Sequence, residues 1–239
     1  MKTKNMSAIR FSLVVLFLLS LTFLFTAKAC KQTKLFESQF NGALGSVPAA
    51  AQAVGTAQVH GAAPGRVVIA TPPGVTPAKW VQITRLATDG DVSSFQGNFS
   101  AAGDGNYTFW ATVLIPSSGG ALSTIQFEQA GQPVTNPVGF MHIDFMPDGK
   151  IRIDDDPSTI FGSYTKDQPF LVQVTFVINA TSAKAHIVLA GAGASGVADR
   201  TIPAAFLFQA RQFGAVRLWV GFPNSGKFYG TSIFVTKAK

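Results

Sequence analysis

The sequence has little from which a disulfide scaffold, a zinc site or a disordered chain could be built. Its 239 residues include 1 cysteine and 3 histidines, and 13% are charged against 47% hydrophobic. A single cysteine excludes a disulfide framework and a cysteine-built zinc module. The low charge and high hydrophobic content exclude a disordered chain. The fold must therefore be stabilised by packing, and the length allows one domain of ordinary size.

The sequence also lacks a basic cluster of the kind that binds nucleic acid. The formal net charge is +7, but four of the basic residues and none of the acidic ones lie in residues 1–29, which leaves +3 for the rest of the chain. The remaining Lys and Arg are scattered, whereas a nucleic-acid footprint needs them on one surface. We therefore expect no nucleic-acid partner.

Only one hydrophobic run is long, and it lies near the N-terminus. The run Phe11–Phe25 follows a basic segment and precedes the small-residue segment Ala27–Ala29. This order is typical of a cleaved signal peptide, and the run of about 15 residues is shorter than the roughly 20 that span a bilayer. The sequence predicts a signal peptide over residues 1–29 and an exported single domain over residues 30–239, secreted or periplasmic.

The one cysteine, Cys30, would be the first residue of the mature chain. A bacterial lipoprotein carries its lipid at this position, although Ala27 stands where that family usually has Leu. Two alternatives stay open. The protein is exported with an incidental thiol, or it is anchored by a lipid on Cys30 at the cell envelope, which is the only membrane contact we expect.

From Leu35 onward the hydrophobic pattern has a period of two, and Gly, Pro, Asn and Asp clusters interrupt it. Alternation of this kind predicts strands. The predicted strands are residues 34–40, 66–70, 80–86, 106–115, 122–129, 138–146, 150–154, 170–179, 184–189, 204–208, 215–221 and 227–236. A dozen strands without long helices predict an all-β, two-sheet antiparallel sandwich or barrel.

Three short segments give local predictions. Pro147-Asp148-Gly149 joins two alternating runs and predicts a hairpin turn, because Pro sets φ and Gly accepts a positive φ. The Ala-rich segment 49–63 predicts a covering segment or a long loop. The segment Gly191–Gly196 has the spacing G-x-G-x-x-G, but Pro203 follows early and no acidic residue follows Asp199, so we expect a flexible loop and not a dinucleotide site.

The two ends of the mature chain resemble a known superfamily. FESQFNGALGSVP near the start and GKFYGTSIFVTK near the end are similar to the first and last strands of concanavalin A-like jelly rolls. W-x-x-I-x-R and G-x-Y-x-F-W strands between them add to the resemblance, which covers most of residues 34–236. This superfamily includes laminin-G-like modules, legume-type lectins and polysaccharide lyases. The resemblance implies a jelly-roll sandwich whose last strand returns beside the first.

Alternate residues of a strand share a face, and several strands place polar residues opposite hydrophobic ones. If the strands pair in order, one sheet face carries the polar set Gln126, Glu128, His142, Asp144, Arg152 and Gln173. The three tryptophans, Trp80, Trp110 and Trp219, also fall in the polar phase, the last beside Arg217. An exposed indole beside amides and charges suits a sugar. Aromatic residues with a purely structural role are the alternative.

Three of these residues could perform proton-transfer chemistry. Glu128, His142 and Asp144 could act as acid, base and orienting carboxylate of a polysaccharide lyase or glycoside hydrolase. The sequence lacks the E-x-D-x-x-E strand of laminarinase-like hydrolases and the Q-[IV]-H strand of alginate-lyase-like enzymes, which share this fold. An ordinary polar surface is the alternative, so enzyme activity stays open and the sequence leans against it.

A structural calcium ion is the only cofactor that the sequence suggests. Asp154, Asp155 and Asp156 are consecutive in a loop and offer the oxygen ligands that calcium prefers; Asp89 and Asp91 form a second acidic loop. A solvated acidic turn is the alternative.

Taken together, these features predict an exported jelly-roll module that binds a polysaccharide, a glycan or another extracellular polymer. The expected ligand-binding residues are Trp110, Gln126, Arg152, Gln173, Arg217 and Trp219. A lyase or hydrolase on the same face is one alternative, and a structural or adhesion module without a small-molecule site is the other. Oligomeric state is not predicted.

Overall fold

A computed structural model describes residues 31–76 and 78–239 of the chain. Residues Thr33–Lys237 form one compact unit, and the description that follows is of this unit. No helix among the described residues is long and apolar enough to cross a membrane. The predictions of a signal peptide in residues 1–29 and of a lipid on Cys30 concern residues outside these ranges and stay predictions.

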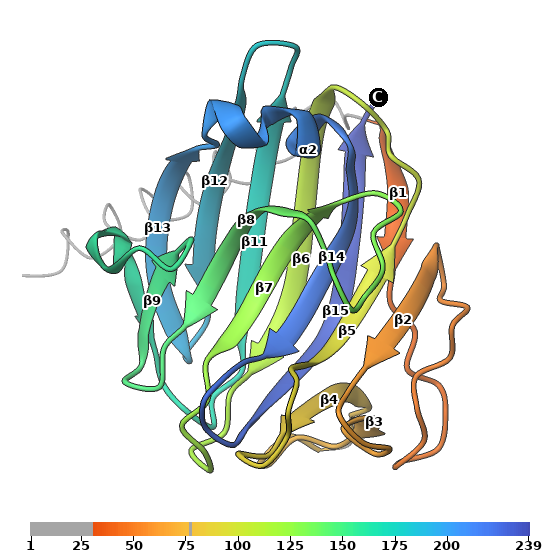
Figure 1. The fold of residues 1–239 in the computed structure, drawn as a ribbon, viewed down its shortest axis with the longest axis vertical. Coiled ribbons are helices and arrows are strands. Elements are labelled where there is room, and N and C mark those ends of the chain that lie inside the picture. Colours follow the sequence, from red (N-terminus) through yellow and green to blue (C-terminus); the bar gives the residue numbers. More distant parts are fainter. Residues whose placement is uncertain (1–30, 77) are drawn as a thin grey trace, which may run out of the picture. The chain divides into compact units, whose positions relative to one another are not determined.

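Strands in the unit hydrogen-bond in one continuous order that folds into two layers (Figure 1). We call the first layer the front sheet and its outer surface the front face. Its strands, in spatial order, are β2 (Thr56–His60), β5 (Ser93–Asn98), β14 (Phe213–Val220), β7 (Ser123–Gln129), β8 (Gly139–Phe145) and β9 (Lys150–Ile153). Neighbouring strands of this sheet are antiparallel.

We call the second layer the back sheet and its outer surface the back face. Its strands, in spatial order, are β13 (Ala194–Thr201), β12 (Ala183–Ala190), β11 (Phe170–Ile178), β6 (Gly105–Leu114), β15 (Gly226–Ala238), β4 (Trp80–Arg85) and β3 (Val67–Ala70), with β1 (Gln32–Glu37) also paired to β15. The first and last strands therefore lie side by side. Strand β10 (Gly162–Tyr164) pairs with β9 on one side and β13 on the other, and so joins the two layers.

The core between the layers is formed by the hydrophobic phase of the strands. Ile125 and Phe127 of the front sheet and Phe109 and Phe176 of the back sheet are fully buried. Phe127 makes edge-on ring contacts with Phe109 at 5.1 Å and with Phe176 at 4.9 Å between centroids. Such contacts add to the stabilisation from burying apolar area. The prediction of an all-β antiparallel sandwich is confirmed.

Most predicted strands are present within two or three residues of their expected bounds, and the predicted hairpin is also confirmed. Gly149 has φ of +85°, the left-handed conformation that the sequence pattern requires of it. Its backbone N–H donates to the carbonyl of Met146 at 3.0 Å. The turn thus connects β8 to β9 and fixes their register.

One predicted strand is wrong. Residues 204–208 form the 3₁₀ helix η2 (Ala204–Phe206) and the start of the short helix α2 (Leu207–Arg211). The segment follows Pro203 and contains Ala204, Ala205 and Leu207, residue types that favour helix more than strand. A second 3₁₀ helix, η1 (Pro157–Thr159), follows β9.

Two segments predicted as loops contain strands instead. Strand β2 lies within the Ala-rich segment 49–63, and β13 begins inside the Gly-rich segment 191–196. Small residues at these places permit close backbone approach and do not mark flexibility. A Cβ added to Gly196 would lie 2.9 Å from the Cα of Gly162 on β10, so glycine is required where these strands meet.

Candidate functional site

Strand register aligns polar side chains in a row across the front face. The row runs over five strands through Gln58, Gln96, Arg217, Gln126 and His142, each opposite the next. A hydrophobic row, Val59, Phe95, Leu218, Ile125 and Ile143, lies one position away and faces the core. The alternation therefore places every member of the first row on the outer surface.

A second polar row lies two positions further along the same strands. It contains Ser94, Trp219, Thr124, Asp144 and Arg152, which are again opposite one another in order. The two rows bring together most of the predicted ligand-binding residues. Glu128 lies two positions from Gln126 on the other side of the first row, opposite Ala215, so it shares the front face with His142 and Asp144, as the sequence predicted for the possible catalytic set.

The segment between β7 and β8, residues 130–138, crosses the front face (Figure 1). Its first residue, Ala130, donates its backbone N–H to Gln212 before β14, and the Gln132 carbonyl accepts a hydrogen bond from the Gln96 side chain on β5. The segment thus spans β14 to reach β5. This crossing accounts for the burial of outward-facing Gln96, Arg217 and Glu128; the sequence predicted Arg217 and Glu128 to be exposed and made no prediction for Gln96.

Several polar atoms on this face have no hydrogen-bond partner among the described residues. They include both carboxyl oxygens of Glu128, Nε of Arg217, Nε1 of Trp219 and Oε1 of Gln96, all of them buried. An unpaired buried polar atom is costly, typically by about 1–3 kcal/mol, and native proteins have few of them. Their concentration on one face is therefore the most informative feature of the site.

Glu128 is fully buried, and burial raises its pKa to about 7, although the positive charge of Arg217 acts in the opposite direction. Burial likewise lowers the pKa of Arg217. Glu128 can therefore hold a proton near neutral pH. A carboxyl group tuned in this way can act as a general acid or donate a hydrogen bond to a ligand.

His142 is held by the neighbouring buried carboxylate of Asp144. Its Nδ1 lies 3.0 Å from Asp144 Oδ1, and its Nε2 lies 3.9 Å from the exposed Asp155 carboxylate. Asp144 also accepts hydrogen bonds from the Thr124 hydroxyl at 2.9 Å and the Asp155 N–H at 2.9 Å. The carboxylate is therefore fixed, and it orients the imidazole.

The two partners shift each other's pKa in opposite directions. Burial disfavours the charged imidazole, but the hydrogen bond and charge of Asp144, with the charges of Asp154 and Asp155, outweigh it and raise the pKa of His142. Burial also disfavours the charged form of Asp144, but its bonds to His142, the Asp155 N–H and Thr124 lower its pKa overall. No hydrogen bond or ion pair within the described part of the chain joins Glu128 to this pair.

The three consecutive aspartates of the predicted calcium loop have different partners. Asp154 accepts from Arg200 at 2.8 Å and from the His142 N–H at 2.9 Å; Asp155 pairs with Arg152 at 2.8 Å. Asp156 accepts from the backbone N–H of Ser158 and caps η1. Calcium needs several oxygen ligands directed at one point. The carboxylate oxygens of these three aspartates are instead directed at separate arginine side chains and backbone N–H groups. The geometry gives the calcium prediction no support, and it stays a prediction.

Two predicted ligand-binding residues lie on the opposite side of the unit. Gln173 on β11 and Trp110 on β6 are paired neighbours on the back face. Trp110 also contacts Phe234, with ring centroids 4.8 Å apart. The prediction that Gln173 shares a face with Gln126 and His142 is wrong, because β10 and β11 pass to the other layer and the strands do not continue as one meander.

Two further side chains differ from the alternation pattern. Trp80 is buried, because it packs with Leu114 and Tyr229 outside the main core, where Val75 and Ala78 also contact the cluster. Phe140 is two positions from the outward-facing His142, so alternation alone would place it on the outer surface; it lies in the core instead, because the register shifts between Phe127 and Glu128 of β7, opposite this end of β8.

The sequence analysis missed the polar residues of β2 and β5. Gln58, Ser94 and Gln96 lie in the two rows described above, and Thr56 and Asn98 lie opposite each other two positions from the first row on the same face. The signal was present in residues 93–98, where Ser94, Gln96 and Asn98 alternate with residues that face the core. Gly97 interrupted that pattern; it lies against the ring of Phe36, where a side chain would not fit.

Comparison with solved structures identifies the fold. An endo-1,3-beta-glucanase from Streptomyces sioyaensis is 12% identical, with 89% of this chain and 99% of that chain covered and a TM-score of 0.55. Lectin II from Ulex europaeus is 12% identical, with 87% and 98% covered and a TM-score of 0.51. No protein-family model and no curated protein matches the sequence. The chain therefore has the concanavalin A-like jelly-roll fold.

Proposed function

We propose that this chain, on its concanavalin A-like scaffold, binds carbohydrate through the front face. The observation that carries the proposal is the group of buried, unpartnered polar atoms on Gln96, Glu128, Arg217 and Trp219. A polyhydroxylated ligand supplies both donors and acceptors, and it could pair with all four residues once residues 130–138, which cover three of them, move away from the face. The half-buried indole of Trp219 beside them offers an apolar surface for the C–H face of a sugar ring.

The fold is compatible with this function but does not establish it. One structural neighbour is an endo-1,3-beta-glucanase, and another is the lectin UEA-II in complex with galactose. Since one fold supports many functions, the support must come from the site itself. Export of the protein, which the sequence predicts, would place this face in contact with extracellular glycans.

A polysaccharide array tests the proposal with a matched pair of variants. Gln126 lies at the centre of the front face and Gln173 at the centre of the back face, and both are half-buried. We expect the parent protein to bind at least one polysaccharide and Gln126→Ala to weaken binding roughly tenfold, a loss of about 1.4 kcal/mol. Gln173→Ala should bind as the parent does. A parent that binds no glycan, or equal behaviour of the two variants, would contradict the proposal and favour a structural module.

A lyase or hydrolase on the same face is the second candidate, and the tuning of two carboxyl groups favours it. The pKa of Glu128 is raised to about 7 and that of Asp144 is lowered, the pattern by which acid and base roles are separated. The array plates can be assayed for reducing or unsaturated ends. The enzyme would be favoured if the parent releases such ends and Glu128→Gln does not release them but still binds the polysaccharide.

A further inference from the structure

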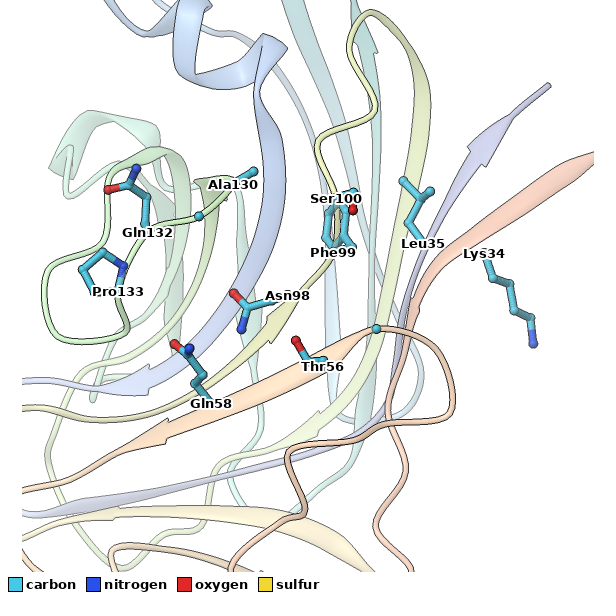
Figure 2. A pocket seen from close by; sticks show the side chains of 12 residues that line it. Lys34, Leu35, Thr56, Gln58, Asn98, Phe99, Ser100, Ala130, Gln132 and Pro133 are labelled. Carbon is cyan, nitrogen blue, oxygen red and sulfur yellow. The ribbon is translucent and has the colours of Figure 1, made fainter.

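A groove of about 910 Å³ lies at the β2 side of the front sheet (Figure 2). Its floor is formed by β2 and the end of β5, and the segment that crosses the front face forms the opposite wall. The lining residues with hydrogen-bonding side chains are Thr56, Gln58, Asn98, Ser100 and Gln132. We call this the amide groove, because three of the five carry carboxamides.

The lining of the amide groove includes a single charged side chain, that of Lys34, which forms an ion pair with a residue outside the groove. Lys34 Nζ donates to both carboxyl oxygens of Glu37 at 2.9 Å. Figure 2 shows the Lys34 side chain directed away from the other lining residues. The remaining lining is uncharged, and it combines carboxamides and hydroxyls with the ring of Phe99, which is held by an edge-on contact with Phe213 at 5.0 Å.

One lining carboxamide is oriented for a ligand by a neighbour outside the groove. The Gln96 side chain donates to Asn98 Oδ1 at 2.8 Å and to the carbonyl of Gln132 at 3.1 Å. These bonds tie the floor of the amide groove to its wall. They also leave the Asn98 Nδ2 group, which has no partner among the described side chains and backbone, to donate toward a bound molecule.

The amide groove is continuous with the front-face site. Asn98 lies opposite Ala215, which lies opposite Glu128, so the groove and the buried carboxyl belong to one row of the sheet. The wall residues Ala130 and Gln132 follow Glu128 within four positions. From β2 to β8 the sheet spans four strand spacings, about 19 Å. A ligand that reaches from the groove to His142 must therefore be an oligomer.

We infer that the amide groove is a subsite for an uncharged sugar unit of the glycan whose other units occupy the front face. The inference rests on the proposed function and deepens it by naming the class of ligand. That class is a neutral oligosaccharide or polysaccharide at this end of the site, and not a chain whose groove-bound unit carries a carboxylate or sulfate.

The test uses an array of neutral and uronic-acid oligosaccharides of two and six units, followed by titration with the two lengths of the oligosaccharide that binds best. The variant Gln58→Ala/Ser100→Ala removes two exposed groove side chains and should fold normally, which a thermal unfolding curve checks. We expect the parent to bind the hexasaccharide at least tenfold more tightly than the disaccharide. The affinity of the variant for the hexasaccharide should be about tenfold lower than that of the parent, and its affinity for the disaccharide should change little.

A charge substitution tests the ligand class. Gln58→Lys and Gln58→Glu should bind the best hexasaccharide with affinities within about threefold of each other if the groove-bound unit is neutral. Tighter binding by Gln58→Lys, together with weaker binding by Gln58→Glu, would overturn the inference in favour of an acidic ligand.

The two proposals fail in different ways. If Gln126→Ala weakens binding but Gln58→Ala/Ser100→Ala binds both lengths as the parent does, the subsite is overturned and the front-face site stands. If the parent binds none of the oligosaccharides, or Gln126→Ala binds as the parent does, the proposed function itself is overturned and the subsite with it.

Discussion

The front and back faces both arise from alternation along the strands, but they differ in which side chains they carry and in how the polar groups are paired. The front row Gln58, Gln96, Arg217, Gln126 and His142 has its counterpart in the back row Val197, Val188, Gln173, Trp110 and Phe234. Within the described ranges, no buried side-chain atom without a hydrogen-bond partner lies on a back-sheet strand, whereas seven front-sheet residues carry at least one. The comparison teaches that unsatisfied polar atoms, and not alternation alone, distinguish the proposed binding face from the back face.

Replacing the buried carboxyl of the front face should give the largest effect. The folded pKa of Glu128 is raised from 4.5 to about 7, so between these values the folded protein binds a proton that the unfolded chain has lost. The free energy of unfolding should therefore fall by about 3 kcal/mol as pH rises from 4.5 to about 7, with the full contribution present below 4.5. Glu128→Gln should remove this dependence.

Denaturant unfolding of the parent and Glu128→Gln at pH 4.5 and pH 8 measures the difference. The variant should be the more stable protein at pH 8, because it buries no carboxylate there. If the free energy of unfolding depends on pH in the same way for both proteins, the pKa of Glu128 is not raised in the folded state. The contrast between the two faces would then lose its main support.

The two half-buried tryptophans provide a paired test of smaller effect. Trp219→Ala on the front face should weaken glycan binding roughly tenfold, about 1.4 kcal/mol. Trp110→Ala on the back face should leave binding unchanged and lower stability, because the ring contact with Phe234 is lost, a contact of about 1 kcal/mol. Calorimetric titration and thermal unfolding of both variants measure the two effects. If Trp110→Ala is fully folded and still binds the glycan more weakly than the parent, the back face is also a ligand surface.

The smallest expected effect is on the imidazole of the front face. Asp144→Asn removes the hydrogen bond and charge that raise the pKa of His142 and leaves the burial that lowers it, so the pKa should fall. Thr124→Val keeps the Asp144 charge and is the matched control, in which the pKa of His142 should stay raised. NMR titration of the imidazole protons follows both. An unchanged His142 pKa in Asp144→Asn would show that the pair is not coupled as its geometry indicates.

Alternation in the sequence was sufficient to predict the fold class, most strands and half of the front face. Gln126 and Glu128 on β7, with His142 and Asp144 on β8, could be grouped because the two strands are consecutive and form an antiparallel pair. Register between adjacent strands follows from the hydrophobic pattern and the turn. Local information was enough here.

The layer to which each strand belongs could not be predicted in the same way. Alternation shows which side of a strand faces the core, but both layers of a sandwich have an outer face. Gln173 has the same pattern as Gln126, and only the passage of the chain through β10 sends it to the other side. The burial of Glu128 beneath residues 130–138 is equally non-local, because no pattern in β7 specifies that the following segment folds back over it.

Strand β10 has a consequence for solubility. By bonding to β9 at Lys150 and Ile151 and to β13 at Ala194–Gly196, its three residues cover part of the backbone edge of each strand, and free edges are where separate molecules pair and aggregate. The junction has room only for glycine at position 162, where a Cβ would lie 2.6 Å from the carbonyl oxygen of Ser195. A single missing side chain thus lets β10 protect the paired parts of two strands from intermolecular strand pairing.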